Sequence, residues 1–508
     1  MKMKKLLAIL MCAILVFSVV AFAACGEPEN PGPQGPGGSG AYSATDPQGR
    51  QVVKVGFAEA GFGSATVRAL VKKFNETNAT YFMDLTVAAA EEFCATAEND
   101  LNANTPKFDL YFLSEIYWKH LALKGYLEDL QEVYDAPFNS NMTISEAMLD
   151  DSRENCYALG LDKKKHFFSI NATASASALI VNMSVANFYE NGGKWGSSKK
   201  ISQVKTVAEL NQWVNKIETL SKTNPYPYGD GGSGEVKGWV YPGQYMVYWD
   251  SFIDTWWAQV EGIHTYRSFF EMAEPAVYNQ TGRLKALEAF ESLNLAAHSL
   301  DCSADDHIKS QQKFLSGRAA LIPNGTWISY ESAGVIAEYG TEIKMIYVPK
   351  ATNTCNDKYI NNAASGLTCI PTKSSDAAKA GAKEFLKFYF REENYPTMFT
   401  KETGSLTGFD GYDGEASYVD SIMDDLSVFA QDCINLVNGA NALVSARPNN
   451  FDAPNYLMLS SGTTNAWPAG KNYTGLIDKE DSVTAQTVFN DSLKQAQNEW
   501  EIWLQKIS

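Results

Sequence analysis

In the first third of the chain, the hydrophobic positions follow in turn the patterns of buried strands and of amphipathic helices. A β-branched run at Gln51–Phe57 is typical of a buried strand, whereas the apolar residues of Thr66–Phe74 recur at the spacing of one helical face. The same criteria predict strands at Tyr81–Val87 and Phe108–Leu113, and helices at Glu91–Leu101 and Leu121–Leu130. This alternation predicts an α/β fold in which a mostly parallel sheet is flanked by helices.

Parallel strands end at a common edge of their sheet, and open α/β sheets bind ligands in the loops beyond that edge. The predicted strands lead into Ala60–Ser64, Ala88–Glu92 and Ser114–Trp118. We therefore expect these three loops to lie together and to contribute to a binding site.

The second half of the chain repeats the alternation less regularly. Helices are expected at Val207–Leu220, Leu284–Ala296, Ala377–Phe390 and Asp481–Lys506. Strands are expected at Ala319–Pro323, Ile343–Val348 and Gly366–Pro371. With 508 residues in all, the chain is too long for one ordinary core and predicts two or more lobes.

The N-terminus has the layout of a secretory signal peptide. Three lysines precede an apolar run from Leu6 to Ala24, which closes on small residues, Cys25 and Gly26. The alternative is an uncleaved membrane anchor, because the run is almost long enough to span a bilayer. The small residues before Cys-Gly resemble a bacterial lipobox, although Phe22 stands where Leu is usual. The resemblance implies a signal peptide at 1–24 and a lipidated Cys25, whose acyl chains would hold the protein on a membrane.

Residues 25–49 are rich in Pro and Gly and cannot bury enough apolar surface to fold, so they are expected to form a tether. Removing the leader changes the formal net charge from −17 to −20, because the leader contains three lysines and no acid. A chain this acidic, with no basic cluster, argues against nucleic acid as a partner.

The cysteines and histidines predict neither a metal nor another cofactor. No Cys-x-x-Cys pair occurs, and no two of the five histidines stand at i, i+4 spacing. An exported chain permits disulfides, so a pair such as Cys355 with Cys369 and free thiols both remain open. The cysteines whose state the sequence leaves open are Cys94, Cys156, Cys302, Cys355, Cys369 and Cys433.

Several segments together resemble the extracellular solute-binding proteins of ABC transporters, in the carbohydrate-type group that includes the maltose-binding protein. The segment Phe314–Trp327 contains Asn-Gly-Thr-Trp after a run of small and apolar residues. Asp109–Leu130, Ile343–Ala380 and Val204–Ile217 are similar to further family segments, in the family's order. Val181-Asn182-Met183 replaces the family's usual Tyr-Asn-Lys, and the region 408–475 is longer than in the family.

The resemblance implies a fold of two lobes, joined by three crossings and closing on a ligand by hinge bending. It places the crossings near Asn171–Ser175, Asn361–Gly366 and Ser405–Asp410. The N-terminal lobe would then comprise residues 50–172 and 364–407, and the C-terminal lobe residues 173–363 and 408–508. Small residues are as common in ordinary connecting loops as in hinges, so both interpretations of these segments stay open.

Aromatic residues make up 12% of the chain and provide material for an aromatic-walled sugar site, in which flat rings cover the apolar faces of a pyranose. The resemblance points to Trp327 with Asn324 as the leading candidates. Ligand-binding candidates from the same lobe are Trp249, Asp250 and Trp256; those from the first lobe are Ser114, Glu115 and Tyr117; Phe62 and Trp467 complete the set. The competing interpretation is that these tryptophans are core residues, and the adjacent Trp256 and Trp257 cannot face the same way on a helix.

The resemblance implies a binding protein and no enzyme. It would be anchored by lipid to the outer face of the bacterial cytoplasmic membrane, and its partners would be a small solute and the permease subunits of an ABC importer. Two alternatives remain, namely a surface glycan-binding lipoprotein that works without a transporter and a binding protein for a polyamine or peptide. A glycoside hydrolase would need a matched pair of carboxylates, and no motif singles one out. The acidic turn Asp410, Asp413, Glu415 lacks a full calcium loop.

Overall fold

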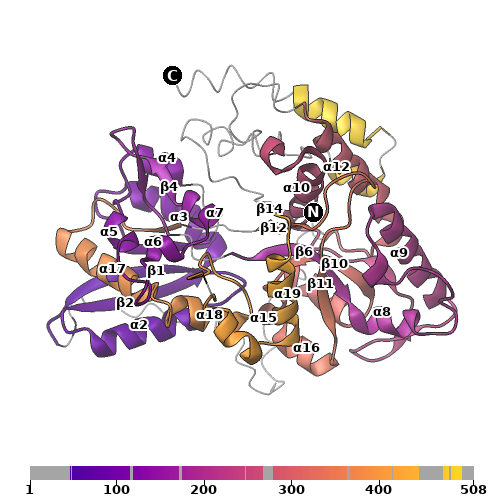
Figure 1. Ribbon diagram of the computed structural model, residues 1–508, viewed down its shortest axis with the longest axis horizontal. Helices are drawn as coiled ribbons and strands as arrows, with labels where there is room; N and C mark the ends of the chain where they lie inside the picture. Colours follow the sequence, from indigo (N-terminus) through magenta and orange to yellow (C-terminus); the bar gives the residue numbers. More distant parts are fainter. Residues whose placement is uncertain are drawn as a thin grey trace, which may run out of the picture. The chain divides into compact units, whose positions relative to one another are not determined.

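The computed structural model divides the folded part of the chain into two lobes, each built on its own sheet (Figure 1). The residues that it describes are 46, 48–114, 118–170, 174–245, 247–266, 279–362, 367–414, 416–444, 473–479 and 482–494. The late helices α17 (Asp376–Tyr389) and α18 (Tyr395–Thr403), orange in Figure 1, lie with the indigo elements of the first lobe. Each lobe is therefore assembled from segments that are far apart in the sequence.

The first-lobe sheet has the strand order β13-β3-β1-β2. Its strands are β1 (Gln51–Glu59), β2 (Tyr81–Ala89), β3 (Leu110–Leu113) and β13 (Leu367–Cys369). β1 pairs in parallel with both β2 and β3, and the helices α2 (Ala65–Thr77) and α3 (Ala90–Asn102) make the connections. The spacing places Val67, Leu70, Val71 and Phe74 on one face of α2, and these four residues are buried.

The remaining elements of the first lobe are mostly short. They are α4 (Lys119–Leu123), α5 (Gln131–Tyr134), α6 (Ile144–Ala147), α7 (Asp150–Glu154), the hairpin of β4 (Tyr157–Leu159) and β5 (Lys165–Phe167), and the 3-10 helix η3 (Asp420–Asp425). The long helix α17 begins at Ser375, whose hydroxyl accepts a hydrogen bond from Ala378 N at 3.2 Å. Its apolar face, including Phe385 and Tyr389, is buried in the lobe core.

The second-lobe sheet has the order β14-β12-β6-β10-β9, with β11 also paired to β6. Its strands are β6 (Ala176–Asn182), β9 (Lys237–Trp239), β10 (Ala319–Gly325), β11 (Ile343–Ile346), β12 (Tyr359–Asn362) and β14 (Ala442–Val444). Every described side chain of β6 and β10 is buried, because helices cover both faces of the sheet.

Several second-lobe helices begin at side-chain caps, such as Thr206 before α9 and Asp306 before α14. The elements are α8 (Met183–Glu190), η1 (Ile201–Gln203), α9 (Val207–Ser221), the hairpin β7 (Tyr226–Pro227) and β8 (Ser233–Gly234), α10 (Val247–Glu261), α12 (Thr281–Ser292), α13 (Leu295–His298), α14 (His307–Leu315), α15 (Ile328–Glu331), α16 (Ala333–Tyr339), α19 (Val428–Asn438) and α21 (Tyr473–Asp478). The single helix predicted at Leu284–Ala296 is instead divided, because Asn294 adopts a left-handed conformation between α12 and α13.

One strand in each main sheet runs against the others, and each of these strands follows a crossing between lobes. β6 is antiparallel to β10, β11 and β12, and β13 is antiparallel to β3. A chain that arrives from the other lobe enters at the edge where the parallel strands end, so it must run backward through the sheet. The carboxyl ends of the parallel strands therefore face the boundary between the lobes in both sheets.

The third crossing lies later in the chain than the expected lobe boundary after residue 407. The segment from Phe409 to Leu426 packs in the core of the first lobe, where Phe409 stacks on Phe138 with ring centroids 5.6 Å apart. The chain then enters α19, which contributes Ile434 to the first-lobe core and Cys433 to the second. Buried aromatic residues thus assign this segment to the first lobe, although its Asn, Gly and Ser content resembles that of an insertion.

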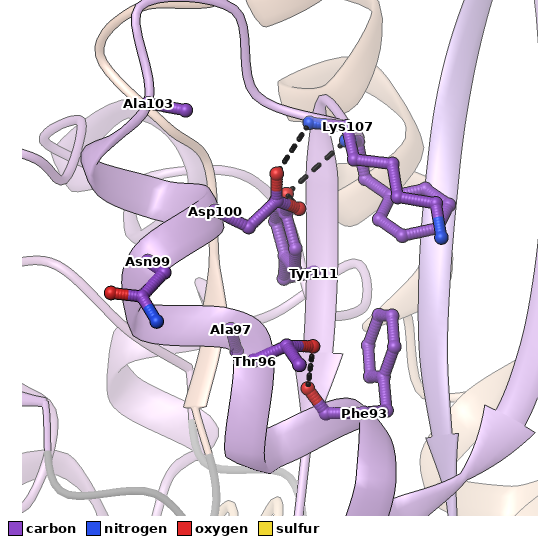
Figure 2. A pocket seen from close by; sticks show the side chains of 9 residues that line it. Phe93, Thr96, Ala97, Asn99, Asp100, Ala103, Lys107 and Tyr111 are labelled. Carbon is purple, nitrogen blue, oxygen red and sulfur yellow. Dashed lines mark hydrogen bonds between the residues drawn. The ribbon is translucent and has the colours of Figure 1, made fainter.

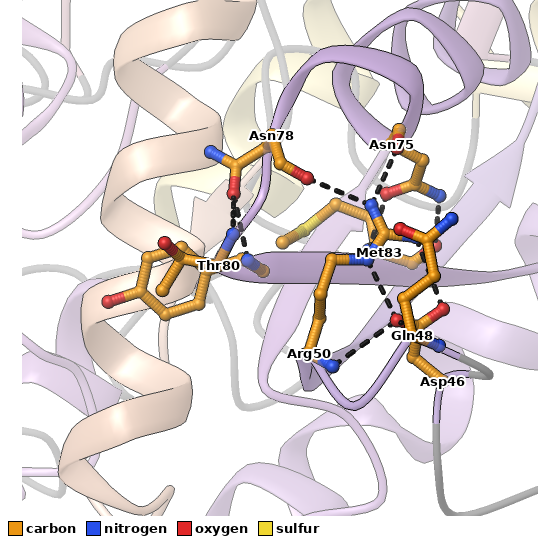
Figure 3. Close-up of polar contacts among 8 residues, drawn as sticks. Asp46, Gln48, Arg50, Asn75, Asn78, Thr80 and Met83 are labelled. Atoms are coloured by element: carbon orange, nitrogen blue, oxygen red, sulfur yellow. Dashed lines mark hydrogen bonds and ion pairs between the residues drawn. The ribbon is translucent and has the colours of Figure 1, made fainter.

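A buried ion pair lies just before β1 (Figure 3). Arg50 Nε lies 2.8 Å from Asp46 Oδ2, and both side chains are almost fully covered. Arg50 Nη1 also donates to the carbonyl oxygens of Asn75 and Asn78 at 2.6 and 2.9 Å. The Arg50 guanidinium holds the pKa of Asp46 below its usual value. These contacts anchor the chain at the amino end of β1, away from the lobe boundary.

None of the helices in the described ranges combines the length and apolar character that a bilayer crossing requires.

The six cysteines of the described ranges are all free thiols, and the pair Cys355 and Cys369 is not bonded. The predicted helix at Asp481–Lys506 is present over residues 485–494, and the rest of it lies outside the described residues.

Candidate functional site

The first lobe brings a tight turn, Ala60–Ser64, to the lobe boundary. β1 ends at Glu59, and Gly63, with φ +63°, turns the chain toward α2. Gly63 N donates to Ala60 O at 2.7 Å, and Ser64 Oγ donates to Glu59 Oε1 at 2.5 Å. The turn is therefore held in one shape by its own hydrogen bonds.

The second lobe brings Trp327 to the same boundary. β10 ends at Gly325 and α15 begins at Ile328, so Trp327 lies in the short turn between strand and helix. A Cβ atom at position 325 would collide with the six-membered ring of Trp327, because the indole lies directly over the Gly325 backbone. Glycine is required there for this close approach. The Asn-Gly-Thr-Trp sequence thus sets the direction of the indole, which remains partly exposed.

Three aromatic rings from the two lobes meet at this point, and we call Phe62, Trp327 and Tyr248 the cross-lobe aromatic group. Phe62 lies edge-on to Trp327, with ring centroids 6.4 Å apart. Tyr248, on α10, approaches Trp327 in the same way at 6.1 Å. Phe62 is supported from behind by Phe399, at 5.0 Å. All three members are partly exposed, so each presents ring surface at the boundary.

A polar contact between the lobes adjoins the aromatic group, and we call it the Tyr330–Glu331 clasp. A Cβ at position 63 would lie 3.0 Å from the Tyr330 hydroxyl, and one at position 61 would collide with the Glu331 carboxylate. The two glycines therefore let the end of α15 lie against the first-lobe turn. Burial raises the pKa of Tyr330, and the nearby negative charges of Glu402 and Glu59 raise it further.

Burial also raises the pKa of Glu331, to about 7. Its carboxylate accepts a hydrogen bond from Gln311 Nε2 at 2.6 Å, which opposes part of that effect. Gln311 is oriented in turn by Ser332, whose hydroxyl donates to Gln311 Oε1 at 2.6 Å. A large fraction of Glu331 is therefore protonated at neutral pH.

A layer of buried polar groups lies in the sheet and helix behind the aromatic group. Ser177 on β6 donates to Ser251 Oγ on α10 at 3.1 Å. Asp254, one turn further along α10, is fully buried, and its pKa is raised well above the usual range by burial and by the charge of Asp250. In the described part of the chain, no three His, Cys, Asp or Glu side chains come close enough to hold a metal ion.

Trp249 and Trp256 are placed differently from the expectation that they line a ligand site. Both are fully buried in the second-lobe core. Trp249 packs against Trp239 and Phe290 at 5.4 and 5.2 Å, and Trp256 Nε1 donates to Pro349 O at 2.8 Å. Both indoles lie on the sides of α10 that the core covers, so they serve as packing, and neither has a face open to a ligand in this conformation.

Asn324 is also fully buried. Its Oδ1 accepts a hydrogen bond from Gly325 N at 2.8 Å, and its Nδ2 reaches no partner among the described residues. The side chain therefore holds the end of β10 in place next to Trp327. Asp250 and Ser114 are partly exposed, and Ser114 Oγ lies 3.7 Å from Cys94 Sγ in the first lobe. Four further candidates, Glu115, Tyr117, Trp467 and the lipidation residue Cys25, lie outside the described residues.

A hollow of about 370 Å³ lies within the first lobe between α3 and the segment that leads into β3 (Figure 2). Phe93, Phe108 and Lys107 are among the residues that line it. Asp100 there accepts hydrogen bonds from the Tyr111 hydroxyl and from Lys107 N. The polar groups of this hollow are thus used by the protein, and no second-lobe residue lines it.

Sequence reasoning did not identify Tyr248, Tyr330 or Glu331. Tyr248 stands next to Trp249 in a helix whose aromatic residues do not share one face, so spacing alone does not show which aromatic faces the boundary. Tyr330 and Glu331 follow Trp327 by three and four residues, which is one helical turn, and that spacing is the signal that predicts a shared face.

A sequence model of the bacterial extracellular solute-binding protein family matches residues 69–421, more than half of the chain. No curated protein matches the sequence.

Solved structures share the fold over almost their whole length. A Streptococcus pneumoniae solute-binding protein, in complex with the blood group A-trisaccharide, is 14% identical; the match covers 88% of this chain and 100% of that one, with a TM-score of 0.60. The GacH receptor of Streptomyces glaucescens, solved unliganded and with acarbose, is 13% identical, over 88% and 97%, with a TM-score of 0.60. The maltose/maltodextrin-binding domain MalE from Bdellovibrio bacteriovorus, bound to maltotriose, is 13% identical, over 89% and 100%, with a TM-score of 0.58.

Proposed function

Because the chain belongs to the bacterial extracellular solute-binding protein family, we propose that it captures a sugar or oligosaccharide between its two lobes and presents it to the permease of an ABC importer. The structural relatives named above bind a trisaccharide, acarbose and maltotriose, which favours a carbohydrate ligand. The protein would bind its solute without changing it chemically, as a receptor does.

The observation that carries the proposal is the placement of Trp327. Its partly exposed indole is held over Gly325 at the end of β10, and Phe62 from the other lobe lies edge-on to it at 6.4 Å. A flat aromatic surface removes the apolar face of a pyranose from water, while polar side chains around it bind the hydroxyls. Trp327, Phe62 and Tyr248 would form the walls, and Asp250 and Glu59 would supply hydrogen-bond acceptors.

Burial raises the pKa of Asp254, and it raises the pKa of Glu331 to about 7. A protonated carboxyl group offers both a donor and an acceptor to sugar hydroxyls. The negative charges of Glu59 and Asp250 belong to the same region, so polyamines are tested beside the sugars. Among the first candidates, Trp249, Trp256 and Asn324 would then support the site from behind, without contacting the ligand.

We propose in addition that Cys25 is lipidated after removal of residues 1–24, and that residues 25–49 tether the domain to the outer face of the cytoplasmic membrane. Replacement of Cys25 by Ser is expected to move the protein from the membrane fraction to the medium. Retention of the Cys25→Ser protein in the membrane would indicate an uncleaved anchor instead.

The ligand class is tested by thermal unfolding of residues 44–508, which form a compact unit. The panel consists of mono- and oligosaccharides, amino acids and polyamines. A ligand at about 100 times its dissociation constant stabilises a protein by roughly 2.7 kcal/mol, which is a readily measured shift. A shift with one sugar series supports the proposal, and a shift with polyamines alone would contradict it.

The alternative of a surface glycan-binding protein without a transporter makes a different prediction. Such a protein would bind insoluble polysaccharide, and its shape would not change on binding. Small-angle scattering with and without the stabilising sugar separates the two. The importer proposal requires a smaller radius of gyration in the bound state, because hinge closure brings the lobes together.

A further inference from the structure

The hairpin of β4 and β5 carries a basic tip on an acidic domain. Lys163, Lys164 and Lys165 form the longest run of lysines in the chain, and all three are exposed. The overall acidity predicts no basic cluster, so this hairpin is a local exception to that expectation. Leu161, at the same tip, is 72% exposed. The hairpin therefore presents an apolar side chain beside three positive charges.

The three ammonium groups at the tip are not used by the protein. Within the described residues none of them forms an ion pair or a hydrogen bond, whereas the neighbouring acids are occupied. Asp129 and Asp162 lie 2.8 and 3.1 Å from the two ring nitrogens of His166, and Glu128 lies 3.2 Å from Lys383. The hydrogen bond to Asp162 raises the pKa of His166, and Asp129 adds to the effect. Concentrated and unpaired positive charge of this kind attracts an anionic surface.

Stacked aromatic rings hold the base of the hairpin. Phe167 stacks on Tyr134 and on Tyr157, with ring centroids 3.6 and 4.0 Å apart. At the tip, Gly160 N donates a hydrogen bond to Lys164 O at 2.9 Å. The lysines are thus displayed on a shape that exists before any partner arrives, which limits the entropy lost on binding.

The tip lies at the edge of the first-lobe sheet that is opposite to the lobe boundary. Leu161 lies against Gly125, where an added Cβ would come within 2.6 Å of the leucine side chain. Gly125 O accepts a hydrogen bond from Thr372 Oγ1 at 2.8 Å, and Thr372 follows β13, which runs away from the boundary. β1 begins at that edge as well. The chain therefore enters the domain at the edge where the tip lies.

The proposed tether would keep the tip close to a membrane. Cys25 and Asp46 are at most about 70 Å apart in a fully extended chain, and about 25 Å apart on average in a flexible one. Tethering at such distances gives even a weak contact a high effective concentration of its partner. Anionic phospholipid headgroups offer the negative charge that the three lysines lack within the protein, and the interfacial zone of a bilayer accepts an apolar side chain such as Leu161.

We propose that the β4–β5 hairpin is a contact surface for anionic phospholipid headgroups. Lys163, Lys164 and Lys165 bind the phosphates, and Leu161 enters the interfacial region between them. The contact orients the tethered domain on the membrane and, because the tip lies at the far edge of the first lobe, leaves the lobe boundary open to solute. The surface is independent of the ligand class, and only its physiological setting rests on the proposed lipid anchor.

The test is flotation of residues 44–508 with vesicles of phosphatidylcholine, alone or mixed with phosphatidylglycerol, in about 0.1 M salt. At that ionic strength the screening length is about 10 Å, so acidic residues elsewhere on the domain repel the bilayer little. The main variant combines Lys163→Gln, Lys164→Gln and Lys165→Gln. The matched control removes the same charge from three exposed lysines at separate places, namely Lys72→Gln, Lys194→Gln and Lys222→Gln.

A second pair of variants tests the apolar part of the contact. Leu161→Ser removes the exposed side chain from the tip, and Val428→Ser removes one of similar exposure, 77%, at the start of α19. Thermal unfolding without vesicles establishes that each variant is folded.

The wild-type domain should bind vesicles that contain phosphatidylglycerol, should not bind neutral vesicles, and should be released by about 1 M salt. The triple lysine variant should lower the partition coefficient about 100-fold, and Leu161→Ser about fivefold. Both control proteins should stay within twofold of the wild type. Absence of wild-type binding, equal binding to the two kinds of vesicle, or an equal loss in the control lysine variant would overturn the inference.

A different partner would give a different pattern. If the wild-type domain ignores vesicles and the triple lysine variant slows solute uptake by cells, the inference is overturned in favour of a surface that contacts the permease. The vesicle assay contains neither sugar nor a lipid on Cys25. Its failure would therefore leave the sugar-binding proposal and the lipid-anchor proposal standing, and their own experiments decide them separately.

Discussion

The second lobe carries tryptophans in two settings, and the contrast shows what makes an aromatic residue available to a ligand. Trp249, Trp256 and Trp257 lie on α10 and are fully buried. Trp256 and Trp257 direct their indole N–H groups to protein acceptors, at 2.8 Å from Pro349 O and 2.6 Å from Gln280 Oε1. Trp327 follows the end of β10 in the same lobe and keeps part of its surface exposed.

The difference arises from the backbone that carries each residue. α10 packs against the sheet and α12, and the three tryptophans lie on its buried sides, whereas Tyr248 in its first turn is partly exposed. Trp327 instead follows the last residue of a strand whose end faces the lobe boundary, and Gly325 lets its ring fold back over the chain. Position at the end of a strand, more than residue type, decides which tryptophan can meet a ligand.

The largest expected effect is on stability, at Trp256. Replacement of Trp256 by Ala should lower the free energy of unfolding by about 3–5 kcal/mol, because it leaves a cavity in a close-packed core and unpairs Pro349 O. Urea denaturation measures this change. Trp256→Phe keeps most of the volume and should cost distinctly less. An effect of Trp256→Ala below about 1 kcal/mol, with a loss of sugar affinity, would reverse the comparison and make Trp256 a ligand residue.

A smaller effect is expected from Gly325→Ala, and it falls on binding. The added Cβ must displace the six-membered ring of Trp327, so sugar affinity should fall about tenfold, or ~1.4 kcal/mol. Calorimetric titration gives the affinity, and thermal unfolding shows whether the fold is intact. Gly193→Ala is a suitable control, since no atom lies within 4 Å of the added carbon and its φ lies outside the left-handed region. Full affinity in Gly325→Ala would show that the ring direction does not matter.

A third effect, the pH dependence of stability, is expected at Glu331. The pKa of its carboxyl is about 7 in the folded protein and near 4.5 when unperturbed, so between these values the folded state binds more protons than the unfolded state. Its contribution to stability is present below about pH 4.5 and is lost as the pH rises toward 7, with a slope of no more than about 1.4 kcal/mol per pH unit. Glu331→Gln should remove this component, as urea denaturation at pH 5, 6, 7 and 8 can measure. Identical pH profiles for the two proteins would contradict the assignment.

Periodicity predicted most of the first lobe, because there each element buries one clear face. The expected strands and helices from Gln51 to Leu113 are present with end points shifted by a few residues at most. It did not predict that β6 and β13 run backward, since strand direction follows from how the chain crosses between lobes. Nor did it assign Phe409–Leu426 to the first lobe, because the segment is polar overall and only a few of its residues, Phe409 and Tyr418 among them, are buried in that core.

The site was predicted in part. Trp327 and Phe62 were named from the sequence and are brought together by the fold. Trp249 and Trp256 were named for the same chemical reason and are buried. α10 buries polar and apolar residues alike, so its spacing does not show which face meets a ligand. Tyr248 and Glu331 depend on contacts between elements that are distant in the sequence, and such contacts leave no local pattern.

The account rests on Trp327 as the ligand-facing tryptophan, and the most direct test is calorimetric titration of the stabilising sugar into three proteins: wild type, Trp327→Ala and Trp249→Phe. We predict that Trp327→Ala lowers affinity about 100-fold, as loss of a central aromatic contact does, and leaves the unfolding temperature without sugar nearly unchanged. Trp249→Phe should lower the unfolding temperature and keep the affinity within about threefold of the wild-type value. Wild-type affinity in Trp327→Ala, or a loss confined to Trp249→Phe, would contradict the central claim.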